Sequence, residues 1–443
     1  MKASKCKFLY AIIFGVVLAA SSPSLAKTIT IFPSGDTTGG LDHFNIQNAM
    51  DSAAAGSTVK LAAGNFYVNQ GIVVVGFNGT LRGTLSDHDE EVLTTLEAVA
   101  PFEYLHATDY NRDNPRTLYD DRIMPSVIFF EFPERKIAVR DLIFVANAPA
   151  YVESRPMWGN TNPDLDTTAL THFIGDFGND VDATYRNLTF IAGEGDYLGS
   201  NVAAAIDTRR GLRRPAGVSR IGDPSLHGIG NAVFKHIRAS NVREYVIVPM
   251  WYKNGTIDVE DVVSDVGTAV TLWGMMEMTT KITDVESIDS RRSLEIRHIY
   301  GGTIKVRRLT SLGGFNPSVR IINAENVDIR DSWLSDANGF GVYWRAPIYI
   351  RSQCQNITLV DNTIVDMTDV PAAVWVRWWD DPLVKNTGVL FKGNYFDPDN
   401  FPGAPGTYAI ILGSDDSRVV EPTLQPNQVL DEGVNNTIKV GGM

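Results

Sequence analysis

One short apolar signature returns along the chain and decides the fold. It reads Val246-Ile247-Val248, Val270-Thr271-Leu272, Leu294-Glu295-Ile296, Val319-Arg320-Ile321, Val342-Tyr343-Trp344 and Val374-Trp375-Val376, with first residues 24, 24, 25, 23 and 32 positions apart. Three-residue β-prone pieces at a period in the twenties are typical of a solenoid, in which each coil buries its apolar residues against the next. We therefore predict an all-β stack of coils.

A second series of triplets supports the same interpretation. Its starts, at 137, 183, 232, 257, 280, 304, 327, 357 and 389, lie 46, 49, 25, 23, 24, 23, 30 and 32 positions apart. Four residues after each start stand Asp141, Asn187, His236, Asp261, Asp284, Arg308, Asp331, Asp361 and Gly393. Asp and Asn tolerate tight turns, so we expect a bend in every coil, and a turn role rather than catalysis for His236. The two long intervals fit either one coil with an insertion or a pair of coils.

The first residues have the pattern of a secretory signal peptide. Lys2, Lys5 and Lys7 precede an apolar stretch over 8–20, and small residues follow at Ser24-Leu25-Ala26. This pattern predicts removal of residues 1–26 and export, to the periplasm or outside, by a bacterium. The apolar stretch is too short to span a membrane. No other segment has the composition of a membrane span.

Composition narrows the function of the mature chain, 27–443. Loss of Cys6 with the signal peptide leaves Cys354 as the remaining cysteine, which excludes an internal disulfide. Loss of three lysines moves the formal charge from −13 to −16, since no acidic residue lies within 1–26. An acidic chain of this kind is a poor general binder of nucleic acid or acidic membrane.

The start of the mature chain carries a family resemblance. Residues 42–55 predict an amphipathic helix with Asp42 as N-cap. Its apolar positions and the extended stretch that follows are Phe44, Ile46, Ala49, Met50, Ala53, Gly56, Val59, Leu61, Gly64 and Phe66. This series resembles the entry to the pectate-lyase-like right-handed parallel β-helix superfamily of secreted polysaccharide-active proteins. The resemblance implies a single right-handed parallel β-helix domain over 27–443, with helix 42–55 capping its open end. Residues 415–443 are expected to form an irregular cap.

Long insertions are concentrated in the first half, at 85–135, 148–180 and 194–229. Long loops on a rigid scaffold either wall a binding groove or lie solvated at the surface, and the sequence leaves both open.

Side-chain alternation separates two outer faces. The second series exposes acids and bases in neighbouring coils, such as Asp258, Lys281 and Arg307, which predicts solvated ion pairs. The first series exposes Thr271, Trp273, Glu295, Arg297, Arg320, Ile322, Tyr343, Arg345, Trp375 and Arg377, with Trp251 and Lys253 one coil earlier. Arginines interleaved with aromatics suit sugars, because rings stack on aromatic faces and guanidinium groups hold carboxylates or sulfates. The resemblance implies a substrate cleft on this same face.

Elimination from a uronic-acid polysaccharide is the first-ranked chemistry for that face. Arg297, Arg320, Arg345 and Arg377 suit neutralisation of the sugar carboxylate, and Tyr343 suits proton exchange, with His298 or Lys253 as substitutes. An arginine base requires an unusually low pKa. Trp251, Lys253, Trp273, Trp375 and Arg377 are the expected binding residues.

Two alternatives stay open. A glycoside hydrolase needs two carboxyl groups roughly 5 to 9.5 Å apart. On this face Glu295 is the one outward acid, and it could instead orient Arg297 or Arg320. Further acids, Asp265, Asp289, Asp336 and Asp366, recur where loops start, which favours a capping role. The third interpretation is a carbohydrate-binding or adhesive envelope protein without catalysis.

No metal or other cofactor is predicted. The seven histidines show no ligand-pair spacing, which argues against zinc. For calcium, the acidic run Asp397-Pro398-Asp399-Asn400 is a candidate place, but no binding motif supports it and a surface turn is the preferred interpretation.

Overall fold

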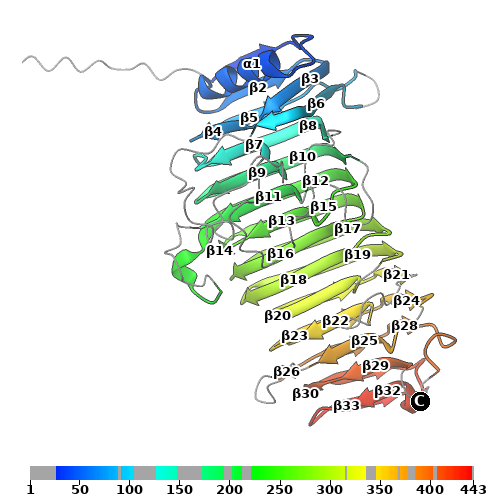
Figure 1. Cartoon of the computed structure of the whole chain (residues 1–443). Coiled ribbons are helices and arrows are strands. Elements are labelled where there is room, and N and C mark those ends of the chain that lie inside the picture. The colour runs from blue at the N-terminus through cyan, green and yellow to red at the C-terminus, as the bar shows by residue number, and fades with distance from the viewer. Residues whose placement is uncertain are drawn as a thin grey trace, which may run out of the picture.

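The computed structural model describes residues 26–87, 91–103, 126–146, 172–193, 202, 204–211, 221–314, 317–335, 346–367, 370–377, 385–402 and 407–441. Over these ranges the chain is nearly all β, with one α-helix, α1 (Gly40–Asp51), and two short 3-10 turns, η2 (Pro224–Leu226) and η3 (Pro426–Gln428). The strands follow one another down the long axis in chain order, from α1 at one end to β33 at the other (Figure 1). The all-β prediction is confirmed.

The chain passes alternately through two parallel sheets. Sheet A contains β1 (Thr28–Ile31), β2 (Ser57–Leu61), β3 (Gly64–Gln70), β5 (Gly79–Arg82), β6 (Thr94–Glu103), β8 (Lys136–Ala146), β10 (Val181–Ala192), β12 (Gly228–Ser240), β15 (Thr256–Asp265), β17 (Thr279–Ile288), β19 (Thr303–Leu312), β21 (Trp333–Ser335), β23 (Gln355–Val360), β24 (Thr363–Val365), β26 (Asn386–Thr387), β27 (Leu390–Lys392), β28 (Tyr395–Phe396), β30 (Ser414–Asp415), β31 (Arg418–Glu421) and β33 (Thr437–Val440). Sheet B contains β4 (Ile72–Val75), β7 (Ser126–Glu131), β9 (His172–Gly178), β11 (Ala204–Arg210), β13 (Tyr245–Met250), β14 (Tyr252–Lys253), β16 (Thr268–Met276), β18 (Arg292–Tyr300), β22 (Ile348–Arg351), β25 (Ala372–Arg377), β29 (Tyr408–Leu412) and β32 (Val429–Asp431). Two strands take part in both sheets, namely β12, whose first residues pair with β14 in sheet B, and β20 (Val319–Arg330).

Equivalent strands of successive coils pair in parallel and in register. In sheet A, β15 pairs with β17 and β17 with β19, and in sheet B, β16 pairs with β18. The nine predicted starts of the second series fall on one line of partners, from Ile137 to Val389. Ile137 pairs directly with Ala183, and Ala183 with Ala232. Each long interval is therefore one coil with an insertion.

The predicted bend in every coil is confirmed by the backbone. The nine residues that follow the starts, from Asp141 to Gly393, all have φ between 53° and 68°. This left-handed region suits Gly, Asn and Asp, which explains the composition of the series. His236 has φ 55° and its Nδ1 lies 2.7 Å from Oδ2 of Asp261 in the next coil, so it is a turn residue.

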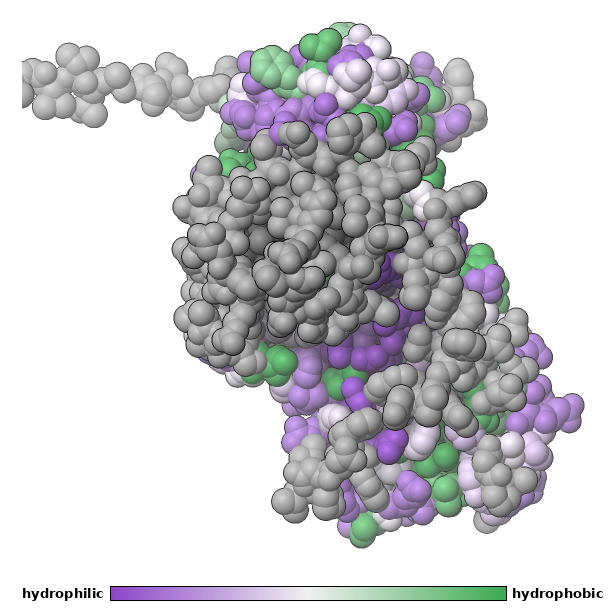
Figure 2. All heavy atoms as spheres, in the orientation of Figure 1, coloured by the Kyte–Doolittle hydropathy of each residue, from purple (hydrophilic) through white to green (hydrophobic). Residues whose placement is uncertain are grey.

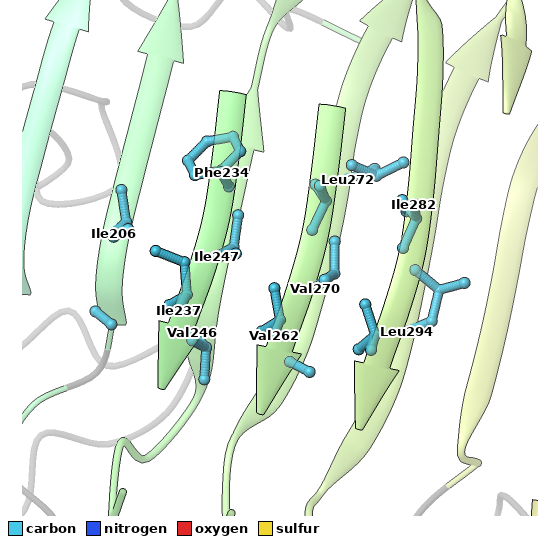
Figure 3. Close-up of a cluster of buried hydrophobic side chains, with 14 of the residues drawn as sticks. Ile206, Phe234, Ile237, Val246, Ile247, Val262, Val270, Leu272, Ile282 and Leu294 are labelled. Atoms are coloured by element: carbon cyan, nitrogen blue, oxygen red, sulfur yellow. The ribbon is translucent and has the colours of Figure 1, made fainter. Parts of the chain in front are cut away.

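Apolar side chains from both sheets fill the interior. Ile247, Val270 and Leu294 come from successive strands β13, β16 and β18 and are fully buried, one above the other (Figure 3). Burial of each such side chain contributes roughly 1.5–3 kcal/mol. The stacking of like residues sets the pitch of the coils and therefore the spacing of everything on the outer faces.

In sheet B the predicted register is wrong in two coils. Ile247, rather than Val246, pairs with Val270, because both Val246 and Ile247 face the interior. Ile348, rather than Val342, pairs with Val319 and with Val374. Val342, Tyr343 and Trp344 lie outside the described residues. The two candidate triplets have nearly the same composition, and only pairing with neighbouring coils distinguishes them.

Helix α1 lies over the first coils, as the capping prediction requires (Figure 1). Ile46, Ala49 and Met50 are buried, but Phe44 is 61% exposed, so its predicted inward position is wrong. Asp42 is not the N-cap, a position held by Gly39. The buried Asp42 carboxylate instead accepts the backbone N–H groups of Ser34 and Tyr67, at 2.8 and 2.9 Å. It therefore ties the helix to the first coil.

The C-terminal region is more regular than expected. Between 415 and 441 it contains β31, β32 and β33, which continue both sheets. Inside the last coils, Glu421 is fully buried and accepts hydrogen bonds from Nδ2 and the backbone N–H of Asn394, at 2.6 and 2.8 Å. Burial raises the pKa of Glu421 to about 7. Cys354 is also buried. Across the ranges given above, no helix is long and apolar enough to cross a membrane.

Candidate functional site

Two rows of outward side chains run along the outer face of sheet B. Strand register aligns the central row, which is Thr271, Glu295, Arg320, Tyr349 and Trp375, and the second row, which is Trp273, Arg297, Ile322, Arg351 and Arg377. Neighbours in a row are one strand spacing, or rung, apart, which is about 4.8 Å. The two rows therefore bring side chains from five coils together on one face, where Thr271, Glu295 and Tyr349 are buried.

Two predicted residues are replaced by residues that the sequence analysis missed. Tyr349 and Arg351 occupy the positions in the rows that were assigned to Tyr343 and Arg345. Tyr343 and Arg345 themselves lie outside the described residues. Both pairs have the form Tyr-x-Arg, six residues apart, so the residue types at these row positions match the prediction while the residue numbers do not.

Three arginines surround the carboxylate of Glu295. Its Oε2 lies 3.5 Å from Nη1 of Arg292, and its Oε1 lies 3.3 Å from Nε of Arg297 and 3.1 Å from Nε of Arg320. Glu295 is 1% exposed. Burial by itself would raise the pKa of Glu295, but the charges of Arg292, Arg320 and Arg297 outweigh burial and lower it. This carboxyl group is ionised and unsuited to donate a proton.

These four residues, the arginine cluster, carry an excess of positive charge. Three guanidinium groups face one carboxylate, and Arg292 and Arg320 are only 3% and 7% exposed. Burial lowers the pKa of Arg320 to about 9, with help from the like charges of Arg292, Arg297 and Arg351 and against the attraction of Glu295. Guanidinium groups are suited to hold carboxylate or sulfate groups, so the cluster is a candidate place for an anionic ligand.

Further along the rows, Tyr349 links a second group of cations. Arg351 and Arg377 lie beside its buried hydroxyl. Burial raises the pKa of Tyr349 despite these two positive charges, so the hydroxyl keeps its proton. The guanidinium carbon of Arg377 lies 5.2 Å from the ring centroid of Trp375, and Tyr349 meets that ring edge-on at 6.1 Å.

His298 lies at a bend beside the rows. It has φ 55° and follows Arg297, in line with Gly274 and Asn323 at the bends of the adjacent coils. Its Nδ1 is 3.3 Å from Nδ2 of Asn323, which also donates to the Tyr300 hydroxyl at 2.9 Å. Burial, followed by the charges of Arg297 and Arg351, lowers the pKa of His298 to about 4. The imidazole is therefore neutral near pH 7.

The tryptophans near the start of the rows play different parts. Trp273 is half-buried, and the guanidinium of Arg297 stacks over it at 4.6 Å. Trp251, expected to be exposed, is 8% exposed and packs against Trp273 and His227. Its ring covers Gly274, where a Cβ would lie 2.3 Å from it. Trp251 is therefore a buried residue that supports the ring of Trp273.

Lys253 lies on β14, outside the arginine cluster. Its Nζ donates to the backbone carbonyl of Pro224 at 2.8 Å. Asp265 accepts from the Ser240 hydroxyl and the Asn241 backbone N–H, at 2.9 and 2.6 Å, which bears out its predicted capping role. Asp336 lies outside the described residues.

One more charged group on this face was missed by sequence reasoning. Asp207 precedes Val248 and Thr271 in the central row and contacts Arg209 and His172, the latter at 3.3 Å between Nε2 and Oδ2. Burial opposes ionisation, but Arg209 and His172 lower the pKa of Asp207 to about 2. Asp207 and Glu295 are three rungs apart, about 14 Å. The basic run at 209–210 was the one sequence signal near this group.

The outer face of sheet A differs. Lys235 contacts Glu260 and Asp258 at 2.7 and 3.1 Å, and Arg307 and Arg330 contact Asp328 at 2.7 and 2.8 Å. The pairs of Lys235 and the pair of Arg307 join neighbouring coils, as predicted, whereas Arg330 and Asp328 lie on the same strand. Hydrophilic residues are prominent on the described surface of the middle coils (Figure 2).

The part of the chain that the structure describes holds no group of three or more His, Cys, Asp or Glu side chains suited to a metal ion. At the acidic run near residue 397, the Asp397 carboxylate accepts the backbone N–H of Asp399 at 3.0 Å, the contact of a tight surface turn.

Comparison with known proteins adds information about the fold. No family model and no curated protein sequence matches the chain. The catalytic domain of a GH87 α-1,3-glucanase in complex with nigerose has a TM-score of 0.51 at 12% identity, covering 95% of this chain and 66% of that chain. DFA-IIIase from Arthrobacter chlorophenolicus A6 without its lid gives 0.47 at 10%, covering 94% and 99%, and a PL6 alginate lyase complex with trisaccharide gives 0.42 at 9%, covering 94% and 86%. This chain spans about two thirds of the glucanase domain, and that likeness concerns the fold alone.

Proposed function

We propose that this protein is an exported right-handed parallel β-helix that binds an acidic polysaccharide on the outer face of sheet B and cleaves it by β-elimination. The observation that carries the proposal is the arginine cluster, in which three guanidinium groups, two of them buried, share one ionised carboxylate. Guanidinium groups gathered on one face suit the carboxylate of a uronic acid, which they can bind in a bidentate way. Export rests on the signal-peptide pattern of residues 1–26.

Charge neutralisation is the first requirement of elimination. Arg297 and Arg320 suit this role, because guanidinium groups beside the sugar carboxylate stabilise the negative charge that develops as the neighbouring carbon loses its proton. Arg292, on the same strand as Arg297, holds Glu295 and so helps to keep the set in place.

Proton transfer is the second requirement. His298 suits the base, since it is neutral at the edge of a cationic group. It would take the proton from the carbon next to the carboxylate, a carbon–carbon double bond would form, and the bond to the leaving glycosidic oxygen would break. Tyr349, which keeps its proton, suits donation to that oxygen, the role first assigned to Tyr343. Arg320 is the second candidate base because its pKa is lowered to about 9.

Hydrolysis is the alternative chemistry that the sequence leaves open. The described acids of the central row suit it poorly. Asp207 and Glu295 are three rungs, about 14 Å, apart, which exceeds the roughly 5 to 9.5 Å that hydrolases use. Both also have a lowered pKa, so neither is a ready acid.

A panel of polymers tests the proposal. The purified protein is incubated with polygalacturonate, alginate, hyaluronan and chondroitin sulfate, and with a neutral α-1,3-glucan. We expect the ultraviolet absorbance of an unsaturated uronic product to grow on an acidic polymer. His298→Ala should lose about 10²-fold or more in rate while still binding, whereas Arg330→Gln, on the other face, should match the wild type.

Two outcomes would contradict elimination. New reducing ends without the absorbance would favour hydrolysis. Binding without either product would favour a carbohydrate-binding or adhesive protein.

A further inference from the structure

We propose that a row of alternating aromatic and hydroxyl side chains on sheet A is a second carbohydrate-binding surface, which holds one strand of a neutral polysaccharide through the faces of its sugar rings. The inference goes beyond the proposed function, because this row lies in the other sheet and contains none of the residues assigned to elimination.

The row, which we call the aromatic row, lies just past the bends of the last coils. It consists of Thr310, Trp333, Thr363 and Tyr395, each two residues after the bend of its own coil and each paired with the next by strand register. Side chains alternate between the two faces of a strand. The row points outward, because the residues that follow its last three members are buried in the core, namely Leu334, Ile364 and Phe396.

Both aromatic side chains of the row face solvent. Trp333 and Tyr395 are each 46% exposed. Neither ring packs against another aromatic ring or a guanidinium group among the residues that the structure describes. Exposed large apolar surface is informative, because it is unfavourable in water and is found where a ligand binds. Both rings are therefore accessible to a ligand.

The fold does not require aromatic residues at this position of the coil. In earlier coils the same line of paired positions holds Ile143, Thr189, Arg238, Val263 and Glu286. Aliphatic, hydroxyl and charged side chains all occupy it without disturbing the register. The aromatic character is thus a property of the last coils and points to a role other than packing.

Strand register fixes the distance between the two rings. Trp333 and Tyr395 are each paired with Thr363, from opposite sides, so two rungs separate them, about 9.6 Å along the coil axis. This separation is comparable to the length of two linked pyranose rings. The hydroxyl of Thr363 lies between the rings and can donate or accept a hydrogen bond, as sugar hydroxyls can. Because hydrogen-bonded strands carry all three side chains, little freedom is lost when a ligand binds.

The charges beside the row favour a neutral ligand. The bends next to it carry Asp331 and Asp361, both exposed and adjacent to each other in neighbouring coils. The basic bend residue Arg308 is held by Asp284, at 2.6 Å between Nε and Oδ1. Lys392 lies on the other side of its bend from the row. Acidic side chains beside the rings would repel a polyanion, whereas stacking on an aromatic ring needs no charge.

Affinity electrophoresis in gels that each contain one polymer tests the inference. The probes are hydroxyethylcellulose, xylan and galactomannan as neutral polymers, and polygalacturonate as the acidic one. We expect at least one neutral polymer to retard the wild type. Trp333→Ala and Tyr395→Ala should each raise the Kd for that polymer by about tenfold or more, because truncation removes a stacking surface.

Two further variants serve as controls. Trp333→Tyr keeps an aromatic ring and should bind within about threefold of the wild type. Phe44→Ala removes an aromatic ring that is 61% exposed on α1, at the other end of the stack (Figure 1), and should leave the Kd unchanged. Melting curves check that each variant folds. If Trp333→Ala does not fold, Tyr395→Ala decides the question.

Four results would overturn the inference. These are no retardation by any of the neutral polymers, equal retardation of the wild type and the folded alanine variants, a loss confined to polygalacturonate, and a dimer in sedimentation that Trp333→Ala dissociates. The last result would assign the row to a second copy of this chain. The proposed function is judged by product absorbance on acidic polymers, and the aromatic row by retardation in neutral ones, so either can fail while the other stands.

Discussion

The outer faces of sheets A and B follow the same strand register but use charge in opposite ways. On sheet A, Arg307 and Arg330 share Asp328 at the surface. On sheet B, three arginines gather around Glu295, which is almost fully buried. The fold constrains inward residues only. Outward positions are free to vary, so sheet A holds ion pairs at the surface while sheet B holds the arginine cluster, our candidate binding site.

Removing the central carboxylate should break this contrast most strongly. Glu295→Gln leaves three arginines without their counter-ion, so we expect the free energy of unfolding in urea to fall by about 3–5 kcal/mol. Asp328→Asn on sheet A should lower it by less than about 1 kcal/mol. Added sulfate should partly restore the first variant and not the second. Equal losses in the two variants would show that the faces do not differ in this way.

A buried carboxyl group without arginine partners should respond to pH with the opposite sign from Glu295. Because the pKa of Glu421 is raised to about 7 from its ordinary value of 4.5, the unfolded chain releases this proton first as pH rises. Glu421 should therefore lower stability progressively between about pH 4.5 and 7, by on the order of 3 kcal/mol. The lowered pKa of Glu295 should instead add stability above its unfolded pKa, and that stability should be lost as pH falls.

Urea unfolding of Glu421→Gln across this pH range isolates that contribution. The variant should show a flatter profile than the wild type, whereas an unchanged slope would mean that Glu421 is not the responsible group.

Loss of one guanidinium from the proposed site should weaken binding more than stability. Arg297→Gln removes a charged partner of the sugar carboxylate, so we expect the Kd for the bound acidic polymer to rise about 10- to 100-fold, corresponding to roughly 1.5–3 kcal/mol. Arg307→Gln, at an outward position of sheet A, is the matched control and should leave the Kd unchanged. Similar losses in both variants would indicate binding through overall charge.

The smallest effect should be the coupling within a pair on sheet A. A double-mutant cycle on Arg307 and Asp328, measured by urea unfolding, should give about 0.2–1 kcal/mol. The same cycle on Arg320 and Glu295 should give a clearly larger value, because that pair is buried. A larger coupling energy for Arg307 and Asp328 than for Arg320 and Glu295 would contradict the distinction between the two faces.

Sequence reasoning succeeded where the signal is local. The bends of sheet A require a left-handed backbone, and residues such as Asp261 and Asn187 reveal that requirement by their identity. Sequence reasoning failed where pairing with neighbouring strands determines which residue occupies a position. Tyr343 and Tyr349 stand in the same Tyr-x-Arg context, and only pairing with Arg320 and Trp375 selects Tyr349.

Two further misses have equally specific causes. Sequence reasoning missed Arg292 because Ser293 and Leu294 are both buried. Two buried residues in a row break the strict inward and outward alternation just before the triplet. Trp251 was placed on the surface because nothing in its own segment shows that Gly274, in the following coil, leaves room for its ring.

The direct pairing of Ile137 with Ala183 and of Ala183 with Ala232 shows how this scaffold can diversify. Those coils have nearly twice the ordinary length, yet the chain re-enters sheet A in register. Segments joining the sheets can therefore be lengthened, exchanged or grafted without altering the pitch that spaces the arginines. For protein engineering, the connections between the sheets can be changed while the spacing of the coils stays fixed.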